Sequence, residues 1–427
     1  MKKLYSFPLA LFALLFSVSV SAQLTNGVLV LNEGSFGTDN AEISFLSEDW
    51  LIPAAFANAN VNTPLGDTAQ SMAFDASHAY VVLNGSNDLK VLDKQTLSLQ
   101  AIMSIGLANP RYIAISNGTA YITCWGDAGN PADDYVAVVD LQSLSITTTI
   151  AAPEGVERIL QIGDKLYVAN QGGYGYGNTV SVIDMGSNTV TATLETGDVP
   201  NSIVSDGSVL YVLCGGKPFW ASEETFGKLM KFNVSDNSLI SEINFADKHP
   251  SNLELYGDYL IFSIDTDIYK ITLGDTALPA NPLFSIEEVG AYGVYGMDVI
   301  GDKIYVADAG DYVNPGRALV YSMDGSLLSA HSVSVTPNSF YAAELLLSTS
   351  NPKDVAAITV YPNPTAEKFF INTEKSAAIR IYDISGRLVK SQQYDPSGVN
   401  VSDLNSGIYM VEIRIENQKS VKRISIK

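Results

Sequence analysis

The most constraining feature of this sequence is a short unit that returns along the chain. Residues 108–124 read "ANPRYIAISNGTAYITC" and residues 199–214 read "VPNSIVSDGSVLYVLC", each with a Pro, an apolar run, a Gly turn and a second apolar run. Seven such units are centred, in their second runs, on Val28, Tyr80, Tyr121, Tyr167, Tyr211, Ile261 and Tyr305. Their spacings of 41 to 52 residues are typical of a β-propeller, whose repeats are about 40–50 residues long.

Each unit also has the internal pattern of four short strands. "AISNGTAYIT" reads as two strands joined by a Gly turn, and "VAVVDLQSLSITTTI" gives a second hairpin that turns at polar residues. The first unit lacks an innermost strand, but residues 337–343, "PNSFYAA", repeat the Pro-led opening seen at Pro110, Pro200 and Pro250. We therefore predict an all-β, seven-bladed propeller in which this last strand completes the first blade and closes the ring.

Composition limits the partners of such a fold. The 427 residues are 46% hydrophobic, enough for large cores, and carry a formal net charge of -21 with a pI near 4.4. Such a surface repels phosphate backbones and anionic lipids, so we expect no nucleic-acid partner. The two cysteines, Cys124 and Cys214, occupy equivalent places in blades three and five. A disulfide needs Cα atoms within about 7 Å, but a whole blade lies between blades three and five. We therefore predict two separate thiols.

The first residues resemble a signal peptide. Lys2 and Lys3 precede the apolar run "FPLALFALLFSVSV", and Val20 and Ala22 stand at the positions that a signal peptidase reads. We expect cleavage before Gln23; the alternative is a membrane anchor. No later stretch approaches the ~18 continuous apolar residues of a membrane span. Position 23 is not the Cys of a lipoprotein.

A first set of residues is predicted to lie at one end of the central channel. Innermost strands begin there, and their first side chains differ in type, as a shaped ligand site requires. They are Gln70, Arg111, Glu157, Asn201, Ser251, Tyr295 and Asn338. A channel mouth that is simply wet remains the alternative. Arg111 suits a phosphate or amide oxygen of a ligand, or else a salt bridge to Glu157.

The loops between second and third strands open on the same end. Several are long, Gly-rich and aromatic, which suits stacking on a ring system or a sugar. Their candidate contacts are Trp125, Tyr174, Trp220 and Tyr312, together with Asn84 and Asn170 at the starts of two loops. Local packing that pins the long loops is the other interpretation.

No catalytic or metal pattern accompanies these residues. His78, His249 and His331 fall in unrelated repeat positions, and no phosphate loop, HExxH or sialidase-type Asp box is present. Acids that could hold calcium lack the spacing of a dedicated loop, so a solvated acidic face is favoured. These acids are Asp127, Asp133, Asp134, Asp308 and Asp311. We therefore expect a protein that is not an enzyme and has neither a cofactor nor a metal.

The last part of the chain differs in charge. Residues 352–427 hold 11 Lys+Arg against 8 Asp+Glu; once these and Lys2 and Lys3 are set aside, 12 basic and 38 acidic residues remain, a net of -26 for the propeller. The tail alternates apolar and polar residues as a small antiparallel sandwich does. The predicted divisions are a signal peptide at 1–22, a propeller at 23–346, a linker at 347–357 and the tail domain at 358–427.

The tail resembles the type A C-terminal sorting domain of type IX secretion in Bacteroidota. The resemblance rests on "YPNP" at 361–364, "SGRL" at 385–388, Leu404-x-x-Gly407-x-Tyr409 and the basic end. It implies handling by the type IX machinery, passage across the outer membrane, removal of the domain, and a secreted or surface-attached product.

The propeller resembles the YncE-like, DUF5074-like surface propellers of the same bacteria. "VLNEGSFGTDNAEISF", "NPRYIA", "LYVANQGGYGYGNTVSVID" and "YGMDVIGDKIYVADAGDYVNPG" carry the resemblance. It is greatest to propellers that capture cobalamin for a TonB-dependent transporter, which implies a small-molecule ligand with a corrinoid as the first candidate. Those relatives are lipoproteins, whereas this chain ends in a sorting domain. A surface adhesion module and a hydrolase or lactonase are the alternatives.

Overall fold

The computed structural model describes residues 24–343 except 25, 26, 48, 49 and 128, and residues 360–426 except 372, 374–376, 384–387, 403, 406, 416 and 417. The chain divides into two units, residues 1–349 and 350–427. The predicted signal peptide, the predicted linker and the 385–387 turn lie outside the described residues.

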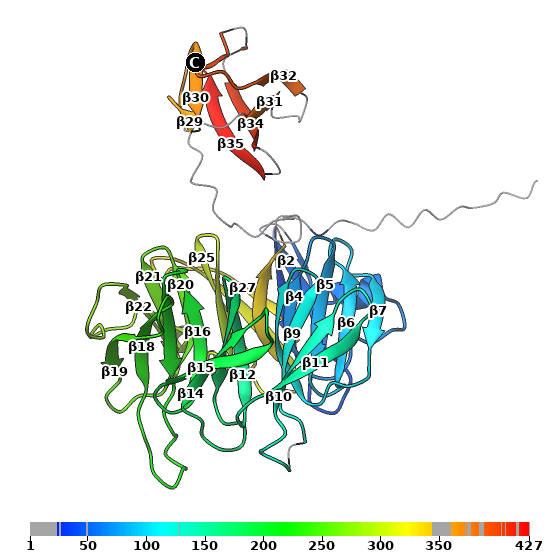
Figure 1. The fold of residues 1–427 in the computed structure, drawn as a ribbon, viewed down its shortest axis with the longest axis vertical. Helices are drawn as coiled ribbons and strands as arrows, with labels where there is room; N and C mark the ends of the chain where they lie inside the picture. Colours follow the sequence, from blue (N-terminus) through cyan, green and yellow to red (C-terminus); the bar gives the residue numbers. More distant parts are fainter. Residues whose placement is uncertain are drawn as a thin grey trace, which may run out of the picture. The chain divides into compact units, whose positions relative to one another are not determined.

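The first unit is built from seven antiparallel sheets of four strands (Figure 1). Six sheets take their strands in chain order. These strands are β4 (Ala69–Phe74), β5 (His78–Leu83), β6 (Asp88–Asp93) and β7 (Leu99–Met103); β8 (Pro110–Ser116), β9 (Thr119–Cys124), β10 (Tyr135–Asp140) and β11 (Ser145–Ala151); β12 (Val156–Ile162), β13 (Lys165–Asn170), β14 (Thr179–Asp184) and β15 (Thr189–Glu195); β16 (Pro200–Ser205), β17 (Val209–Cys214), β18 (Lys228–Asn233) and β19 (Leu239–Asn244); β20 (Pro250–Tyr256), β21 (Tyr259–Ile264), β22 (Asp267–Thr272) and β23 (Phe284–Ser285); and β24 (Gly296–Ile300), β25 (Lys303–Asp308), β26 (Pro315–Ser322) and β27 (Leu327–Val335).

The remaining sheet joins the two ends of the unit. Its order is β28 (Pro337–Ala342), β1 (Gly27–Asn32), β2 (Glu42–Ser47) and β3 (Leu51–Ile52). β28 runs antiparallel to β1 and pairs Ser339 with Leu31 and Ala342 with Val28. The helical elements are α1 (Ala55–Ala59) and the 3₁₀ turn η1 (Ile286–Val289). The predicted all-β class is confirmed.

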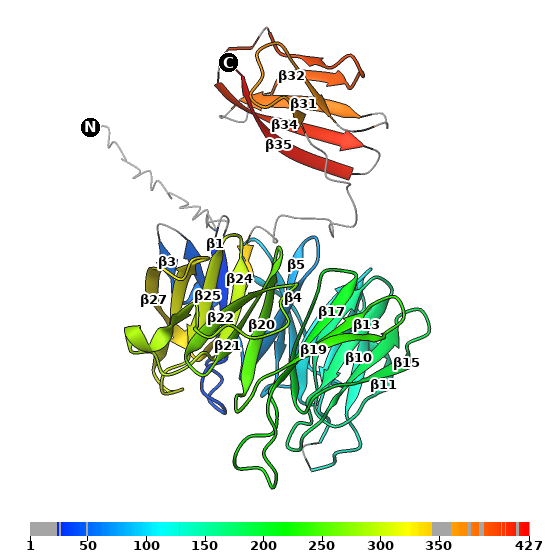
Figure 2. The ribbon, with the colours of Figure 1, turned by 90° about the vertical axis from the view of Figure 1, so that its left-hand side faces the viewer.

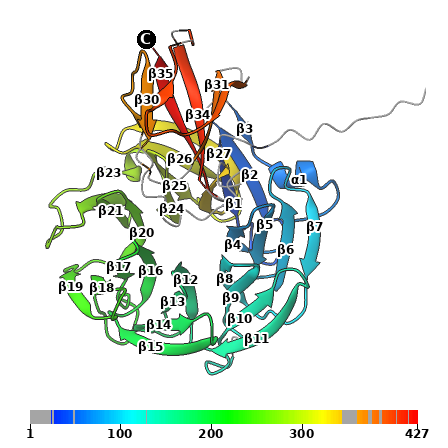
Figure 3. The ribbon, with the colours of Figure 1, turned by 45° about the horizontal axis from the view of Figure 1, so that its top comes forward.

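The sheets follow one another around a centre (Figure 3). β4 lies against β8, β8 against β12, β12 against β16, β16 against β20, β20 against β24 and β24 against β28, while β1 lies against β4. This is a propeller-like arrangement, with the first strand of each repeat innermost.

Burial explains why the second strands are the clearest sequence signal. In β5 every residue after His78 is buried, because both faces of the sheet are covered by neighbouring sheets. Tyr80 and Val82 pack toward the sheet of β8–β11, whereas Val81 and Leu83 pack toward the sheet that contains β1. The outer strand β15 is mostly exposed and polar.

The structure corrects the alignment of the first repeat by one residue. The aromatic centres are the third residues of their strands, and the third residue of β1 is Leu29, not Val28. Leu29 packs toward the second sheet, as Tyr80 packs toward the third. Val28 faces the other way, against Tyr305 and Phe340. The hydrophobic pattern of β1 is continuous, so it does not reveal which face each residue takes.

The two cysteines are separate, as predicted. Cys124 and Cys214 are both free and buried. Burial raises the pKa of each thiol to about 12, so both stay protonated and unreactive at neutral pH.

The second unit is a small sandwich (Figure 2). One sheet contains β29 (Val360–Tyr361), β30 (Lys368–Ile371) and β33 (Val399–Asn400); the other has the order β32 (Leu388–Gln393), β31 (Ala378–Asp383), β34 (Gly407–Ile415) and β35 (Gln418–Ile426). The two sheets share one core, to which Phe369 and Val399 contribute from the first and Val411 and Ile424 from the second. Among the described residues, no helix has the length and apolar character needed to cross a membrane.

Candidate ligand site at the channel mouth

A repeated turn sets the geometry of the channel mouth. The residue before the innermost strand has a positive φ in five repeats, and its carbonyl accepts a hydrogen bond from the N–H of the residue that follows the second strand. The carbonyl residues are Thr68, Asn109, Gly155, Val199 and Thr336, and their donors are Asn84, Trp125, Gln171, Gly215 and Glu33. This hydrogen bond therefore holds the first residue of each loop beside the start of the innermost strand.

Bulges then aim the first side chains of the innermost strands. The register shifts directly after Ala69, Pro110, Val156 and Pro200, so the next residue, and after Pro110 and Val156 the next two, have no partner in the ladder. Such a bulge bends the strand and redirects the side chain of the extra residue. Tyr295 differs, because it precedes β24, donates its N–H to the Ala307 carbonyl, and lies beside a ladder without a shift.

Arg111 is held by a carboxylate and an indole. Its Nε lies 2.9 Å from Glu157 Oε2 and its Nη2 lies 2.8 Å from Glu157 Oε1, which is a bidentate pair. The guanidinium carbon lies 4.2 Å from the centre of the Trp125 ring. Trp125 donates its Nε1–H to the Val156 carbonyl at 2.8 Å, and its ring meets Tyr174 edge-to-face at 5.9 Å. Of the two roles predicted for Arg111, the structure shows the salt bridge.

A second carboxylate at the mouth, Glu33, was missed by the sequence analysis. Asn338 donates to its Oε1 at 2.9 Å and the Tyr295 hydroxyl donates to its Oε2 at 2.8 Å. Tyr295 also meets Tyr312 edge-to-face at 5.5 Å. With β1 aligned on Leu29, Glu33 takes the place that Trp125 and Asn84 hold in their repeats, so a shift of one residue would have found it.

These groups surround a cavity of about 350 Å³. Its walls include Glu33, Gln70, Asn84, Arg111, Tyr295 and Tyr312. Phe36, which is 82% exposed, also lines it. The amide of Asn84 donates to the Pro110 carbonyl at 3.2 Å, so this side chain is fixed in place. The cavity thus combines aromatic surface with oriented polar groups, as small-ligand sites commonly do.

The charges at the mouth perturb one another. Burial raises the pKa of Glu33, although the hydrogen bonds from Asn338 and Tyr295 and the charge of Arg111 oppose the shift. Burial alone would lower the pKa of Arg111, but Glu157 outweighs it and the net shift is upward. Burial and the Glu33 carboxylate both raise the pKa of Tyr295. The mouth therefore holds Arg111 as a cation and Tyr295 as a hydrogen-bond donor.

Two smaller polar cavities are lined by other residues of the innermost strands. One of about 160 Å³ is lined by Tyr112, Glu157, Asn201 and Ser251, among others. One of about 70 Å³ contains Arg158, Glu254 and Asp298. Burial raises the pKa of Asp298, and burial together with Asp298 raises that of Glu254.

Several predicted residues lie elsewhere. Asn170 is the last residue of β13 and is buried, with its amide donating to Thr179 and Ser181; Gln171 occupies the mouth position instead. Trp220 is 72% exposed and packs on Phe219. In the described part of the chain, no ring contact joins this pair to Trp125 or Tyr295.

The predicted solvated acidic face is wrong for two of its five members. Asp134 is buried and accepts the Gly155 N–H at 2.7 Å, and Asp308 is buried and pairs with Arg317 at 2.7 Å. Burial raises the pKa of Asp134 to about 6. These two acids hold loop backbone and a neighbouring strand rather than face water. Within the described residues, no group of three or more His, Cys, Asp or Glu is arranged to hold a metal.

Glu33 leads to a prediction on pH. Its folded pKa lies above the ordinary 4.5, so the folded protein retains a proton that the unfolded chain loses as pH rises past this value. We expect the free energy of unfolding of wild type, relative to E33Q, to fall as pH rises from 4.5 to the folded pKa and to stay constant above it. Urea unfolding of both proteins from pH 4 to 8 measures this. A difference that does not change with pH would contradict the assigned burial of Glu33.

Comparisons with known proteins agree with this architecture. A family described as Domain of unknown function (DUF5074) matches residues 26–307, and one described as Secretion system C-terminal sorting domain matches residues 359–427. The chain is 27% identical over 111 residues to the ulvan lyase NLR42 of Nonlabens ulvanivorans, which covers 25% of this chain and 20% of the relative's length.

Solved structures share the fold. A quinoprotein alcohol dehydrogenase-like protein of Bacteroides thetaiotaomicron matches with a TM-score of 0.54 and 15% identity, over 75% of this chain and 79% of the other. The computationally designed Ika8 protein matches with a TM-score of 0.50 and 12% identity, over 74% and 89%. At these identities the likeness concerns the fold alone.

Proposed function

Because this chain belongs to the DUF5074 family and carries a type IX sorting domain that directs it to the cell surface or the medium, we propose that it is an exported protein. We propose further that its propeller binds a ligand. In this proposal the seven sheets are seven blades, closed by β28, and the ligand binds at the channel mouth. The observation that carries the proposal is the mouth cavity, whose walls include Glu33 and Arg111, the latter held by Glu157.

The site binds without catalysis in this proposal. Both oxygens of Glu157 are engaged by Arg111, and both oxygens of Glu33 accept hydrogen bonds from Asn338 and Tyr295. These hydrogen bonds hold both carboxylates in place, whereas a general acid or base must also direct a free lone pair or a proton at the substrate. Hydrolysis of esters or lactones by the purified protein, lost in E33Q, would replace this part of the proposal with a hydrolase.

A corrinoid is the first candidate ligand, on the family resemblance. Its macrocycle is flat and apolar, and its rim carries amides that can donate to carboxylates. The mouth offers matching groups: exposed aromatic rings at Phe36, Tyr174 and Tyr312, and carboxylates at Glu33 and Glu157. A cavity of about 350 Å³ admits part of such a ligand, with the rest lying across the loops. A TonB-dependent receptor is the partner that the resemblance implies.

Titration calorimetry with cyanocobalamin tests the proposal. We expect micromolar binding to the mature chain, and a loss of about 10-fold or more in W125A, because the ring that packs on Arg111 at the cavity wall is removed. W220A is the matched control, since Trp220 lies apart from the mouth, and it should bind as wild type does. Y295F keeps the ring and removes only the donor to Glu33, so it tests the polar part of the site with little risk to folding.

Three outcomes separate the parts of this claim. Absence of heat and of any change in the cyanocobalamin spectrum at micromolar concentrations ends the corrinoid assignment. Binding that W125A and Y295F leave unchanged, with melting curves like that of wild type, places the ligand elsewhere. If the protein binds cyanocobalamin but no receptor co-purifies with it from the outer membrane, the capture role stands and the transporter partner is ruled out.

A further inference from the structure

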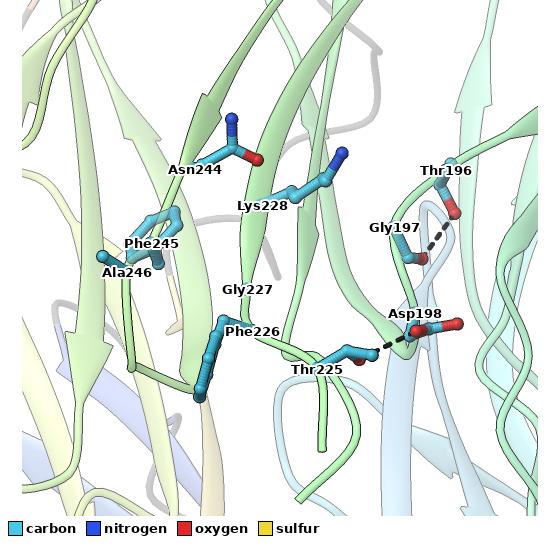
Figure 4. A pocket seen from close by; sticks show the side chains of 10 residues that line it. All are labelled: Thr196, Gly197, Asp198, Thr225, Phe226, Gly227, Lys228, Asn244, Phe245 and Ala246. Carbon is cyan, nitrogen blue, oxygen red and sulfur yellow. Dashed lines mark hydrogen bonds between the residues drawn. The ribbon is translucent and has the colours of Figure 1, made fainter. Parts of the chain in front are cut away.

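A second cavity, of about 460 Å³, lies against the sheet of β16–β19 and shares no lining residue with the mouth cavity. Its walls are the segment Thr196–Asp198, the beginning of β18 with the residues before it, and the end of β19 with the two residues after it (Figure 4). The volume falls in the range of small-ligand sites, roughly 300–1,000 Å³.

Two phenylalanines give the cavity an apolar side. Phe245 is fully buried, whereas Phe226 is 42% exposed. The Phe226 ring packs against the His249 ring at 5.9 Å, which limits its rotation. A partly exposed, supported aromatic ring is a surface on which a flat apolar face can stack.

The polar groups of the cavity are oriented by partners. Asp198 Oδ2 accepts the Thr225 hydroxyl at 2.8 Å and lies 3.6 Å from Lys217 Nζ. Among the described residues, no hydrogen bond engages Asp198 Oδ1. Lys228 is paired with Glu242 at 3.3 Å and stands opposite Asn244 in the β18–β19 ladder, so the two side chains share a face.

One residue that lines the cavity, Phe226, differs in type from its equivalents in the other repeats. Lys228 pairs with the last residue of its second strand, and Phe226 stands two residues before it. The residues equivalent to Phe226 by this pairing are Asn40, Ser86, Asp133, Gly177, Asp265 and Pro315. An aromatic side chain at this position occurs in this repeat alone, so the scaffold does not require it.

We propose that this cavity binds a neutral sugar. A pyranose has C–H groups on one face, which suit the Phe226 ring, and hydroxyls at its edge. Those hydroxyls can donate to Asp198 Oδ1 and to the Asn244 carbonyl and accept from Lys228. One acid and one paired base line the cavity, so its charges favour a neutral ligand over an ionic one.

Saturation-transfer NMR on the full mature chain tests the site with methyl glucoside, galactoside, mannoside and xyloside, N-acetylglucosamine and cellobiose. We expect transfer to at least one sugar, and about a 10-fold weaker affinity in F226A and in N244A. Both side chains are exposed, so the variants should fold. F219A, an exposed Phe of the same loop outside the cavity, and W125A at the mouth should bind as wild type does.

Absence of transfer from every sugar at about 10 mM, or affinities unchanged in both F226A and N244A, would overturn the proposal. Loss of sugar binding in W125A but not in F226A would also overturn it, because the sugar would then occupy the mouth. The first two results do not bear on cyanocobalamin binding, which depends on the mouth residues.

Discussion

Replacing Arg111 with Met is expected to lower the free energy of unfolding by about 3–5 kcal/mol, because it leaves the Glu157 carboxylate buried without its partner. The side chains of the pair are only 16% and 6% exposed. The Trp125 ring also loses the guanidinium that covers one of its faces. Urea unfolding monitored by tryptophan fluorescence measures the change.

K228M is the matched control, since it breaks an ion pair whose side chains are each 35% exposed. Exposed pairs contribute about 0–1 kcal/mol, so the control should lose little stability. The double variant R111M/E157Q should recover part of the loss, because it removes the unpaired charge. Equal effects of R111M and K228M would show that the pair at the mouth is as hydrated as one at the surface.

The second large effect is expected where β28 pairs with β1 and packs against the last sheet. Phe340 is 2% exposed, pairs opposite Val30, and packs against Tyr305 at 5.5 Å. F340A should lower the free energy of unfolding by about 3–5 kcal/mol, as truncation of a buried Phe generally does. Thermal and urea unfolding of the full chain measure the loss.

F36A applies the same truncation to a ring that is 82% exposed on the first sheet's loop, so its stability should stay within about 0.5 kcal/mol of wild type. If F340A unfolds no more readily than F36A, β28 contributes little to the unit, which is then held by the contacts between the other sheets. That result would also refute the proposed role of β28 in closure.

The sequence predicted the sheets well because second strands such as β9 and β17 are buried on both faces and end at fixed distances from a Pro-led strand. It failed at single-residue register. Val28 was assigned to the repeat position that Leu29 occupies, and this error of one residue concealed Glu33. A similar error assigned Asn170 to the position that Gln171 occupies. Side chains alternate along a strand, so an error of one residue moves a side chain from the mouth to the core.

Loop conformation was the other limit. Trp220 lies in the long connection between β17 and β18, and strand patterns do not determine how such a loop folds. Trp125 was predicted more reliably because it directly follows β9, where the turn at Asn109 fixes its backbone. The role of Arg111 could not be predicted from the sequence either, because a bulge in each of two adjacent strands brings it to Glu157.

The pairing of β28 with β1 sets the order in which this chain can mature. Synthesis begins at the amino end, and some 300 residues separate β1 from the strand that covers its inner edge. At roughly 5–20 residues per second, that edge waits about 15–60 seconds for its partner. An uncovered edge is a template for other strands. The export pathway therefore receives a chain whose first sheet is vulnerable to aggregation until nearly the whole propeller has been made.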